Sequence, residues 1–134
     1  MRYMLDTNIV SHLLRGHALV MQRVTQLPMA SLCISSITEA ELQFGLAKRP
    51  GNKALHQAVK ELLLRLESLP WSSAAALVYG VARWRTTQSG KTIAPLDLLI
   101  ATHALSIGAV LVTNDQALMQ LEGLQVQDWT LADT

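Results

Sequence analysis

Two hydrophobic patterns alternate along this chain: short continuous apolar runs, and longer stretches in which apolar residues recur every three or four positions. The short runs lie at 2–5, 32–34 and 109–112, with weaker ones at 68–71 and 124–126. Runs of this length between turn residues are typical of buried strands. Strands alternating with helices predict an α/β fold, in which helices cover both faces of a parallel sheet.

Helical periodicity fills the segments between these runs. Gly16, Gly108 and the Pro50–Gly51 pair mark helix ends, and Pro95 suits a first helical position. Ser36 and Glu39 match a capping box, in which each side chain satisfies a free backbone amide of the first turn. We therefore expect helices at 9–15, 18–26, 37–48, 53–67, 72–87 and 94–108, and a short one at 115–121. The chain contains no repeat or linker, so residues 1–134 form one domain.

The balance of charge excludes a globally basic nucleic-acid-binding protein. Eleven basic and ten acidic residues leave a net charge of +1, so an RNA or DNA partner would need local basic patches. Two such patches exist, Lys48–Arg49 with Lys53, and Arg83–Arg85 with Lys91. Each could hold phosphates, and Trp84 could stack on an unpaired base. A solvated helix face with Trp84 packed beneath it is the simpler interpretation, and we favour it.

The sequence also predicts the compartment. Cys33 lies in a predicted buried strand and has no second cysteine to pair with. Asp6 interrupts the first apolar run before it reaches the length of a signal peptide. The longest apolar stretch, 98–112, contains polar residues and is too short to span a bilayer. We expect a soluble, cytoplasmic protein that does not contact a membrane.

Two acidic residues follow predicted strands. Asp6 comes directly after the first strand, and Asp115 follows the strand at 109–112 after Thr113 and Asn114. If these strands are parallel neighbours, both carboxylates reach one edge of the sheet, the edge where open α/β sheets bind ligands. Each residue could instead simply cap the helix that follows. We expect Thr7 or Asn8 to provide the first cap and to leave Asp6 free.

Helix geometry separates the two glutamates at 39 and 41. Residues two positions apart on a helix point to opposite faces, so only one of them can face the interior. Glu39 is assigned to the capping box, whereas Glu41 shares a face with Ile37 and Gly45. Gly45 would let another backbone approach closely, or would mark a tight helix crossing. Glu41 is therefore the candidate for the functional site.

Asp97 lies in a segment, 93–101, that is otherwise apolar on every side. A first-turn acid that complements the helix dipole is the alternative interpretation. That alternative is weak here, because the helix has no polar face on which to expose a carboxylate. His103, six residues later, points away from Asp97 and is expected to be a packed or surface histidine.

Four carboxylates in one cleft would repel each other unless a cation compensated their charge. Ligand sets made only of oxygen suit hard cations such as Mg²⁺, or Mn²⁺ in its place, rather than zinc. Such a metal can polarise a phosphodiester and activate a water molecule. The acids therefore predict metal-assisted phosphodiester hydrolysis.

The motifs that carry these acids resemble those of the PIN-domain ribonucleases, specifically the VapC-type toxins. The matching segments are Asp6–Asn8, Thr38–Leu42 with Gly45, Asp97 in its apolar helix, and Thr113–Asp115. The resemblance extends over nearly the whole chain. It implies that Asp6, Glu41, Asp97 and Asp115 are both the catalytic residues and the Mg²⁺ ligands, with Thr113 as a polar neighbour.

The resemblance also implies a three-layer PIN-like fold with an open sheet of four or five parallel strands. It implies a homodimer and a cognate VapB-type antitoxin that covers the cleft and neutralises the toxin. The substrate would be a specific RNA, with the anticodon loop of initiator tRNA as the first candidate. A catalytically inert RNA- or partner-binding module of the same fold is the alternative. An aspartyl-phosphate phosphotransferase fits less well, because it needs an acid where this chain has Asn8.

Overall fold

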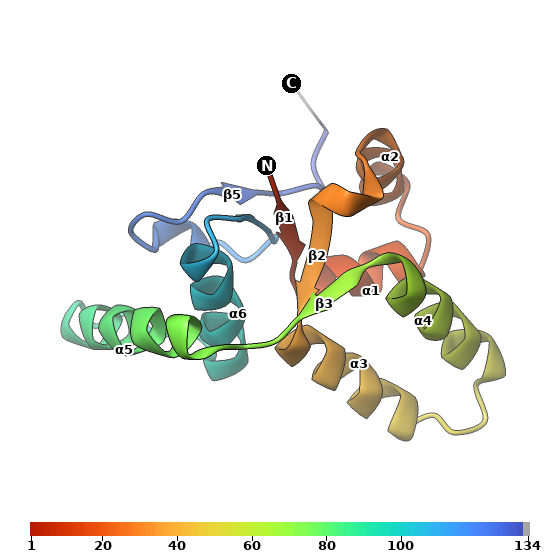
Figure 1. Ribbon diagram of the computed structural model, residues 1–134, viewed down its shortest axis with the longest axis horizontal. Coiled ribbons are helices and arrows are strands. Elements are labelled where there is room, and N and C mark those ends of the chain that lie inside the picture. Colours follow the sequence, from red (N-terminus) through yellow and green to blue (C-terminus); the bar gives the residue numbers. More distant parts are fainter. Residues whose placement is uncertain (133–134) are drawn as a thin grey trace.

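A five-stranded parallel sheet forms the centre of the protein (Figure 1). The computed structural model describes residues 1–132. The strands run in the order β3-β2-β1-β4-β5, and every pairing is parallel. Their bounds are Tyr3–Leu5 (β1), Leu32–Ser35 (β2), Glu67–Leu69 (β3), Val110–Val112 (β4) and Val126–Gln127 (β5). The first strand of the chain is thus the central one, and β4 is its direct neighbour.

Six α-helices connect the strands and cover both faces of the sheet, so the predicted three-layer α/β fold is confirmed (Figure 1). None of the helices in residues 1–132 is long and apolar enough to cross a membrane. The helices are Thr7–Leu14 (α1), Ala18–Gln26 (α2), Ser36–Ala47 (α3), Lys53–Arg65 (α4), Ser73–Gln88 (α5) and Pro95–Ser106 (α6), with 3₁₀ turns at Met29–Ser31 (η1) and Leu118–Gln120 (η2).

The prediction of a helix at 115–121 is wrong, because only the 3₁₀ turn η2 forms there. Hydrogen bonds between side chains and the backbone hold this segment in turns. The Asp115 amide donates to Thr113 Oγ1, and the Ala117 amide donates to Asp115 Oδ1. Such local bonds compete with helical ones. The helix expected at 53–67 also ends earlier, at Arg65, and the backbone is extended at Leu66.

The predicted capping box at Ser36 and Glu39 is also wrong. Helix α3 begins one residue earlier than expected, and Ser35 is its N-cap, with its hydroxyl accepting from the Ile37 amide. The Ser36 hydroxyl accepts from the Trp71 amide, and the Glu39 carboxylate accepts from the Ser68 hydroxyl. Ser36 and Glu39 thus bond to β3 and the loop after it and do not form the predicted capping box.

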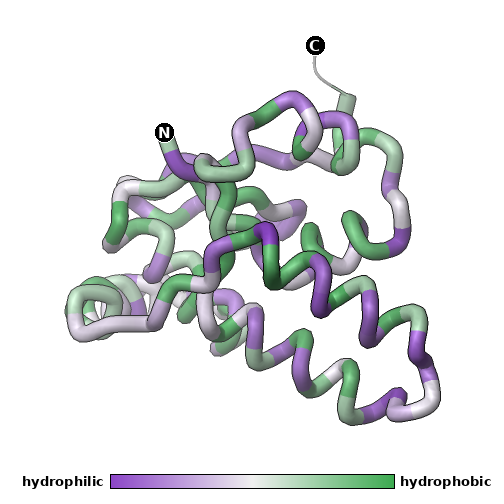
Figure 2. The backbone as a smooth tube through the Cα atoms, turned by 45° about the vertical axis from the view of Figure 1, so that its right-hand side comes forward, coloured by the Kyte–Doolittle hydropathy of each residue, from purple (hydrophilic) through white to green (hydrophobic). Residues whose placement is uncertain are grey.

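The strands β1, β2 and β4 each contribute side chains to two separate hydrophobic clusters. On β1, Leu5 joins the cluster formed with α1, α2 and α4, whereas Met4 joins the cluster formed with α6 and η2. Cys33 of β2 and Leu111 of β4 lie with Met4. Sheets buried on both faces read as continuous apolar runs, which is why these strands show no polar alternation. Figure 2 shows this hydrophobic centre and a hydrophilic connection between α3 and α4.

Truncation of a core side chain in the sheet should destabilise the protein. Leu111 is fully buried, and Leu64 on α4 is 80% exposed. We expect Leu111→Ala to lower the free energy of unfolding by about 2–5 kcal/mol, because it removes buried methyl groups and leaves a cavity. Leu64→Ala, the matched control, should change it by less than about 0.5 kcal/mol. Urea denaturation measures both, and equal losses in the two variants would contradict this description of the core.

Candidate active site

Asp6 follows the central strand directly and is only 3% exposed. Its amide donates to the Val112 carbonyl of β4, and its Oδ1 atom accepts from the Ile9 amide at 2.9 Å. Asp6 is therefore the N-cap of α1. The expectation that Thr7 or Asn8 provides this cap is wrong. The same carboxyl group both caps the helix and lies at the carboxyl edge of the sheet.

Burial raises the pKa of Asp6 to about 6. Hydrogen bonds from the Thr113 side chain and the Ile9 amide oppose this shift, and the negative charges of Asp97 and Asp115 add to it. A carboxyl group removed from water loses hydration of its charged form, which explains the dominant effect. Asp6 thus lies close enough to both other aspartates to feel their charges.

Glu41 faces the same edge from α3. The Thr7 hydroxyl donates to Glu41 Oε1 over 2.6 Å, and the Thr7 and Thr38 hydroxyl oxygens are 3.3 Å apart. Glu39 points toward β3 instead, as its bond to Ser68 shows. Both glutamates are half-buried and bonded to other elements, so the prediction that only one of them faces the interior is wrong. The role of Thr7 in holding Glu41 was missed, because its sequence position indicated only a helix cap.

Gly45, one turn beyond Glu41, does not allow the close backbone approach that its sequence position indicated. A Cβ atom placed on this glycine would meet no heavy atom within 4 Å. That explanation of the glycine is wrong. The space beside it belongs to a groove between α1, α3 and α4.

Asp97 lies in the first turn of α6, a helix whose residues Leu98, Ile100 and Ala101 are buried. Burial raises the pKa of Asp97, and the charges of Asp115 and Glu41 raise it further, as does a hydrogen bond shared with the Asp115 carboxyl. Asp97 therefore links the acids from α3 and from the loop after β4. The structure brings all four predicted acids into one cluster.

Asp115 reaches this cluster through a turn that Thr113 organises. The Thr113 Oγ1 atom accepts from the Asp115 amide at 3.0 Å, while the Thr113 side chain also hydrogen-bonds to Asp6. Asp115 Oδ1 accepts from the Ala117 amide at 2.9 Å. The helix-capping role weighed for Asp115 is wrong, because the 3₁₀ turn η2 has Ala117 as its N-cap and no side-chain cap. The Asp115 carboxyl group instead holds a turn beside Asp97.

His103 is not part of the cluster. It is buried, and its Nδ1 atom lies 2.8 Å from the hydroxyl of Ser35, the N-cap of α3. Burial lowers the pKa of His103. The predicted packed histidine is confirmed, and it ties α6 to the start of the helix that carries Glu41.

The favoured interpretation of the two basic patches is confirmed for their solvated surfaces and wrong for Trp84. Trp84 is 62% exposed, so the expectation that it packs beneath a solvated face is wrong. In the first patch, the Lys48 ammonium lies 4.6 Å from the centre of the exposed Phe44 ring. In the second, Arg85 pairs with Glu122 at 3.3 Å. Both patches lie on solvated surfaces.

The donor chemistry of the four acids fits a hard divalent cation. In the part of the chain that the structure describes, no Lys, Arg or His nitrogen lies within 4.0 Å of any of the four carboxylates. No three His, Cys, Asp or Glu side chains in residues 1–132 are grouped closely enough to hold one ion together. Mg²⁺ does not require such a group, because it keeps several waters and uses one or two protein carboxylates. The cluster therefore suits Mg²⁺ better than a metal that needs a closed protein cage.

Comparison with known sequences places this chain in a family. The profile of the PIN domain matches residues 3–124. This chain belongs to the PIN-domain family. Ribonuclease VapC1 of Haemophilus influenzae is 38% identical over 97% of this chain and 99% of its own length. The tRNA(fMet)-specific endonuclease VapC of Shigella flexneri is 30% identical, with the same coverage of both chains.

Comparison with solved structures gives the same result. VapBC2 from Rickettsia felis, solved with a DNA fragment from its promoter, contains a chain that superposes with a TM-score of 0.89. The two chains are 33% identical, and the match covers 96% of this chain and 99% of the other. The predicted PIN family and VapC resemblance are confirmed.

Metal-free protein should lose stability as pH rises through the pKa of Asp6. An ordinary aspartate has a pKa of 3.8, against about 6 for folded Asp6. Between about pH 4 and pH 6 the unfolded chain releases this proton while the folded chain keeps it, so the free energy of unfolding falls with pH. The shift of about 2 pKa units corresponds to about 3 kcal/mol.

The Asp6→Asn variant tests this directly, because asparagine can still cap α1 but cannot ionise. Urea denaturation in EDTA across this pH range should show the variant gaining stability relative to the wild type, with the full gain present above about pH 6. Asp128→Asn, which changes an aspartate outside the cluster, should follow the wild type. If the free energies of unfolding of the wild type and of Asp6→Asn changed with pH in the same way, folding would not raise the pKa of Asp6.

Proposed function

We propose that this chain is the toxin of a toxin–antitoxin pair, a Mg²⁺-dependent endoribonuclease that cuts a specific RNA. Endoribonuclease is the enzyme class of the VapC family to which the chain belongs. The observation that carries the metal dependence is the cluster of Asp6, Glu41, Asp97 and Asp115, in which no carboxylate pairs with a Lys, Arg or His of residues 1–132. Its acids repel each other, and a bound cation would offset that repulsion.

We propose all four acids as the catalytic residues and as metal ligands, with one or two carboxylates binding Mg²⁺ directly and the others through its waters. When bound, Mg²⁺ would polarise the scissile phosphodiester and lower the pKa of the attacking water. Asp6 is fixed by the α1 cap and by Thr113, and Glu41 is fixed by Thr7, so both offer oxygens at defined positions. Rigidly placed charges stabilise a transition state without the cost of reorganisation.

Asp97 is the best candidate for the general base. It is only partly buried, and burial together with its acidic neighbours raises its pKa above the ordinary value of an aspartate. A raised pKa favours proton transfer near neutral pH. A carboxylate oxygen of Asp97 would take a proton from the attacking water as the water oxygen bonds to phosphorus. The bond from phosphorus to the 3′-oxygen would break, and that oxygen would take a proton from solvent, which leaves a 5′-phosphate and a 3′-hydroxyl on the cut RNA.

Initiator tRNA, cut in its anticodon loop, is our first candidate substrate. The relative from Shigella flexneri carries specificity for tRNA(fMet) in its name, and it matches this chain over almost its full length. A VapB-type antitoxin is the proposed partner, since the Rickettsia felis relative was solved as a VapBC complex. The toxin and its substrate would meet in the cytoplasm.

We further propose a homodimer. Leu77, Val81 and Trp84 lie on one face of α5 and are 75%, 48% and 62% exposed. Their spacing of four and three residues places them in one stripe along the helix. An exposed apolar stripe of this kind is typical of an interaction surface. A second copy of this chain would cover it.

Incubation of purified protein with total tRNA tests both the activity and its site. Wild type should cut tRNA in Mg²⁺ and not in EDTA. Asp6→Asn and Asp97→Asn should each lower the rate by at least about 100-fold, because metal and base positions contribute on this scale. Asp128→Asn, outside the cluster, should retain wild-type activity. Sequencing of the cut ends identifies the tRNA and the cleavage site.

Undiminished cutting by both cluster variants would contradict the assignment of these acids. Folded wild type that binds tRNA but never cuts it in Mg²⁺ or Mn²⁺ would support the inert binding module. Cleavage of elongator tRNAs in preference to initiator tRNA would reject only the proposed substrate.

A further inference from the structure

A groove leads away from the acidic cluster between α1, α3 and α4. Its volume is about 430 Å³, and six of its twelve lining residues are polar. These are Thr7, Ser11, Arg15, Glu41, Arg49 and Asn52. Thr7 and Glu41 are the hydrogen-bonded pair of the proposed active site. The groove is therefore continuous with the place where an RNA would be cut.

Two arginines lie at the other end of this groove. Arg15 follows the last residue of α1, and Arg49 lies two residues after the end of α3. Arg15 Nη2 lies 3.3 Å from His12 Nδ1. Within residues 1–132, no carboxylate oxygen lies within 4.0 Å of either guanidinium group. Two positive charges on the groove thus lack an acidic partner in the described chain.

Helix dipoles give a simpler reason for finding arginines here. Cations are favoured near helix C-termini, and Arg15 and Arg49 follow two of them. The helix dipole explains the position of each arginine separately, and it predicts that both arginines act only on stability. It does not explain why both line one groove that begins at the acids.

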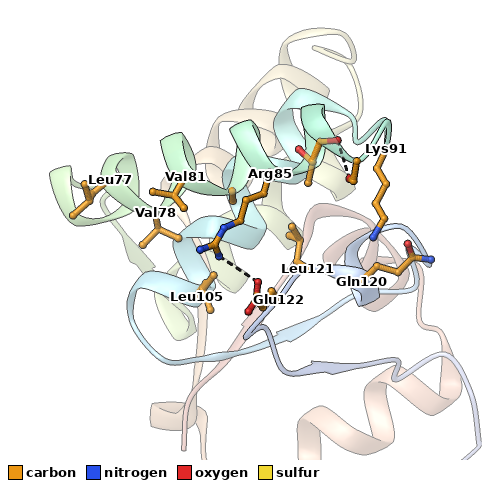
Figure 3. Close-up of a pocket in the computed structure, with 12 residues that line it drawn as sticks. Leu77, Val78, Val81, Arg85, Lys91, Leu105, Gln120, Leu121 and Glu122 are labelled. Carbon is orange, nitrogen blue, oxygen red and sulfur yellow. Dashed lines mark hydrogen bonds and ion pairs between the residues drawn. The ribbon is translucent and has the colours of Figure 1, made fainter.

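The second basic patch is less suited to bind phosphate. Figure 3 shows Arg85 beside a mainly apolar cavity between α5, α6 and η2, with its guanidinium bonded to Glu122. An arginine already paired with a carboxylate would have to break that pair before it could bind an anion. Because the arginines of the groove between α1, α3 and α4 have no such pair to break within residues 1–132, this groove is better suited to bind a polyanion.

We propose that this groove binds the single-stranded RNA segment next to the cut, with Arg15 and Arg49 holding its backbone phosphates. The inference rests on the proposed ribonuclease function and extends it to substrate binding. Guanidinium groups form paired, charge-assisted hydrogen bonds with phosphate oxygens. The apolar floor, which includes Leu14 and Leu46, offers a surface for a base.

The length of the groove sets which phosphates the arginines reach. Helix α1 has eight residues, which corresponds to about 12 Å at 1.5 Å per residue. Stacked nucleotides rise about 3.4 Å each along a strand. Arg15 and Arg49 would therefore contact phosphates roughly two to four nucleotides from the one that is cut.

The salt dependence of RNA binding tests this proposal. The probe is a fluorescein-labelled 12-nucleotide oligouridylate, titrated in EDTA so that no cutting occurs. The double variant Arg15→Gln/Arg49→Gln should bind about tenfold more weakly than wild type. The slope of log affinity against log salt should fall by about 1.4, since each contact to a single-strand phosphate contributes about 0.7. In tRNA cleavage, KM should rise while kcat changes little.

A matched double variant, Lys60→Gln/Arg65→Gln, removes the same charge from the exposed surface of α4, outside this groove. It should keep nearly the wild-type slope and KM. Equal effects of the two double variants would overturn the proposal, as would an unchanged slope for Arg15→Gln/Arg49→Gln. Normal RNA binding combined with weakened antitoxin binding would assign the groove to a protein partner instead. Wild type that cuts no RNA would reject the proposed function, and the binding titration would still decide whether the arginines hold RNA.

Discussion

Burying a carboxylate at the end of the central strand costs free energy, and the hydrogen bonds around the proposed active site depend on that constraint. Asp6 is almost fully buried, and burial is the largest cause of the rise of its pKa to about 6. An isolated buried charge is expensive, so the structure supplies two hydrogen bonds, from the Ile9 amide and from Thr113. Two further aspartates nearby increase the repulsion rather than relieve it. A divalent cation is the group that would balance this arrangement.

The topology brings the acids together and small hydroxyl side chains hold them. Parallel pairing of β1 with β4 places Asp6 and Thr113 at one edge, and Thr113 also orders the turn that carries Asp115. Thr7 spans the gap from α1 to Glu41 on α3. These hydrogen bonds connect α1 with α3 and order the loop after β4, so they hold the carboxylates in place without a bound metal or RNA. Such preorganisation is what electrostatic catalysis requires.

The sequence predicted the sheet, the helices and the acidic cluster because each depends on strong local patterns. Buried parallel strands are short apolar runs, and residues at their carboxyl ends share one edge. The capping box failed because Ser36 and Glu39 bond to residues near β3, more than 25 positions away. Trp84 was misplaced because the apolar positions of α5 do not show which face meets α6. Thr7 was overlooked because its partner, Glu41, comes from another helix.

The central claim is that a divalent metal binds at the edge of the sheet where Asp6, Glu41, Asp97 and Asp115 lie. The most direct measurement is the anomalous difference density of a crystal soaked in Mn²⁺, which replaces Mg²⁺ at oxygen sites. We expect one or more peaks beside the carboxylate oxygens of these four residues, and none there in crystals of Asp97→Asn soaked in the same way. A wild-type crystal with its strongest peak elsewhere, and none at this edge of the sheet, would contradict the account.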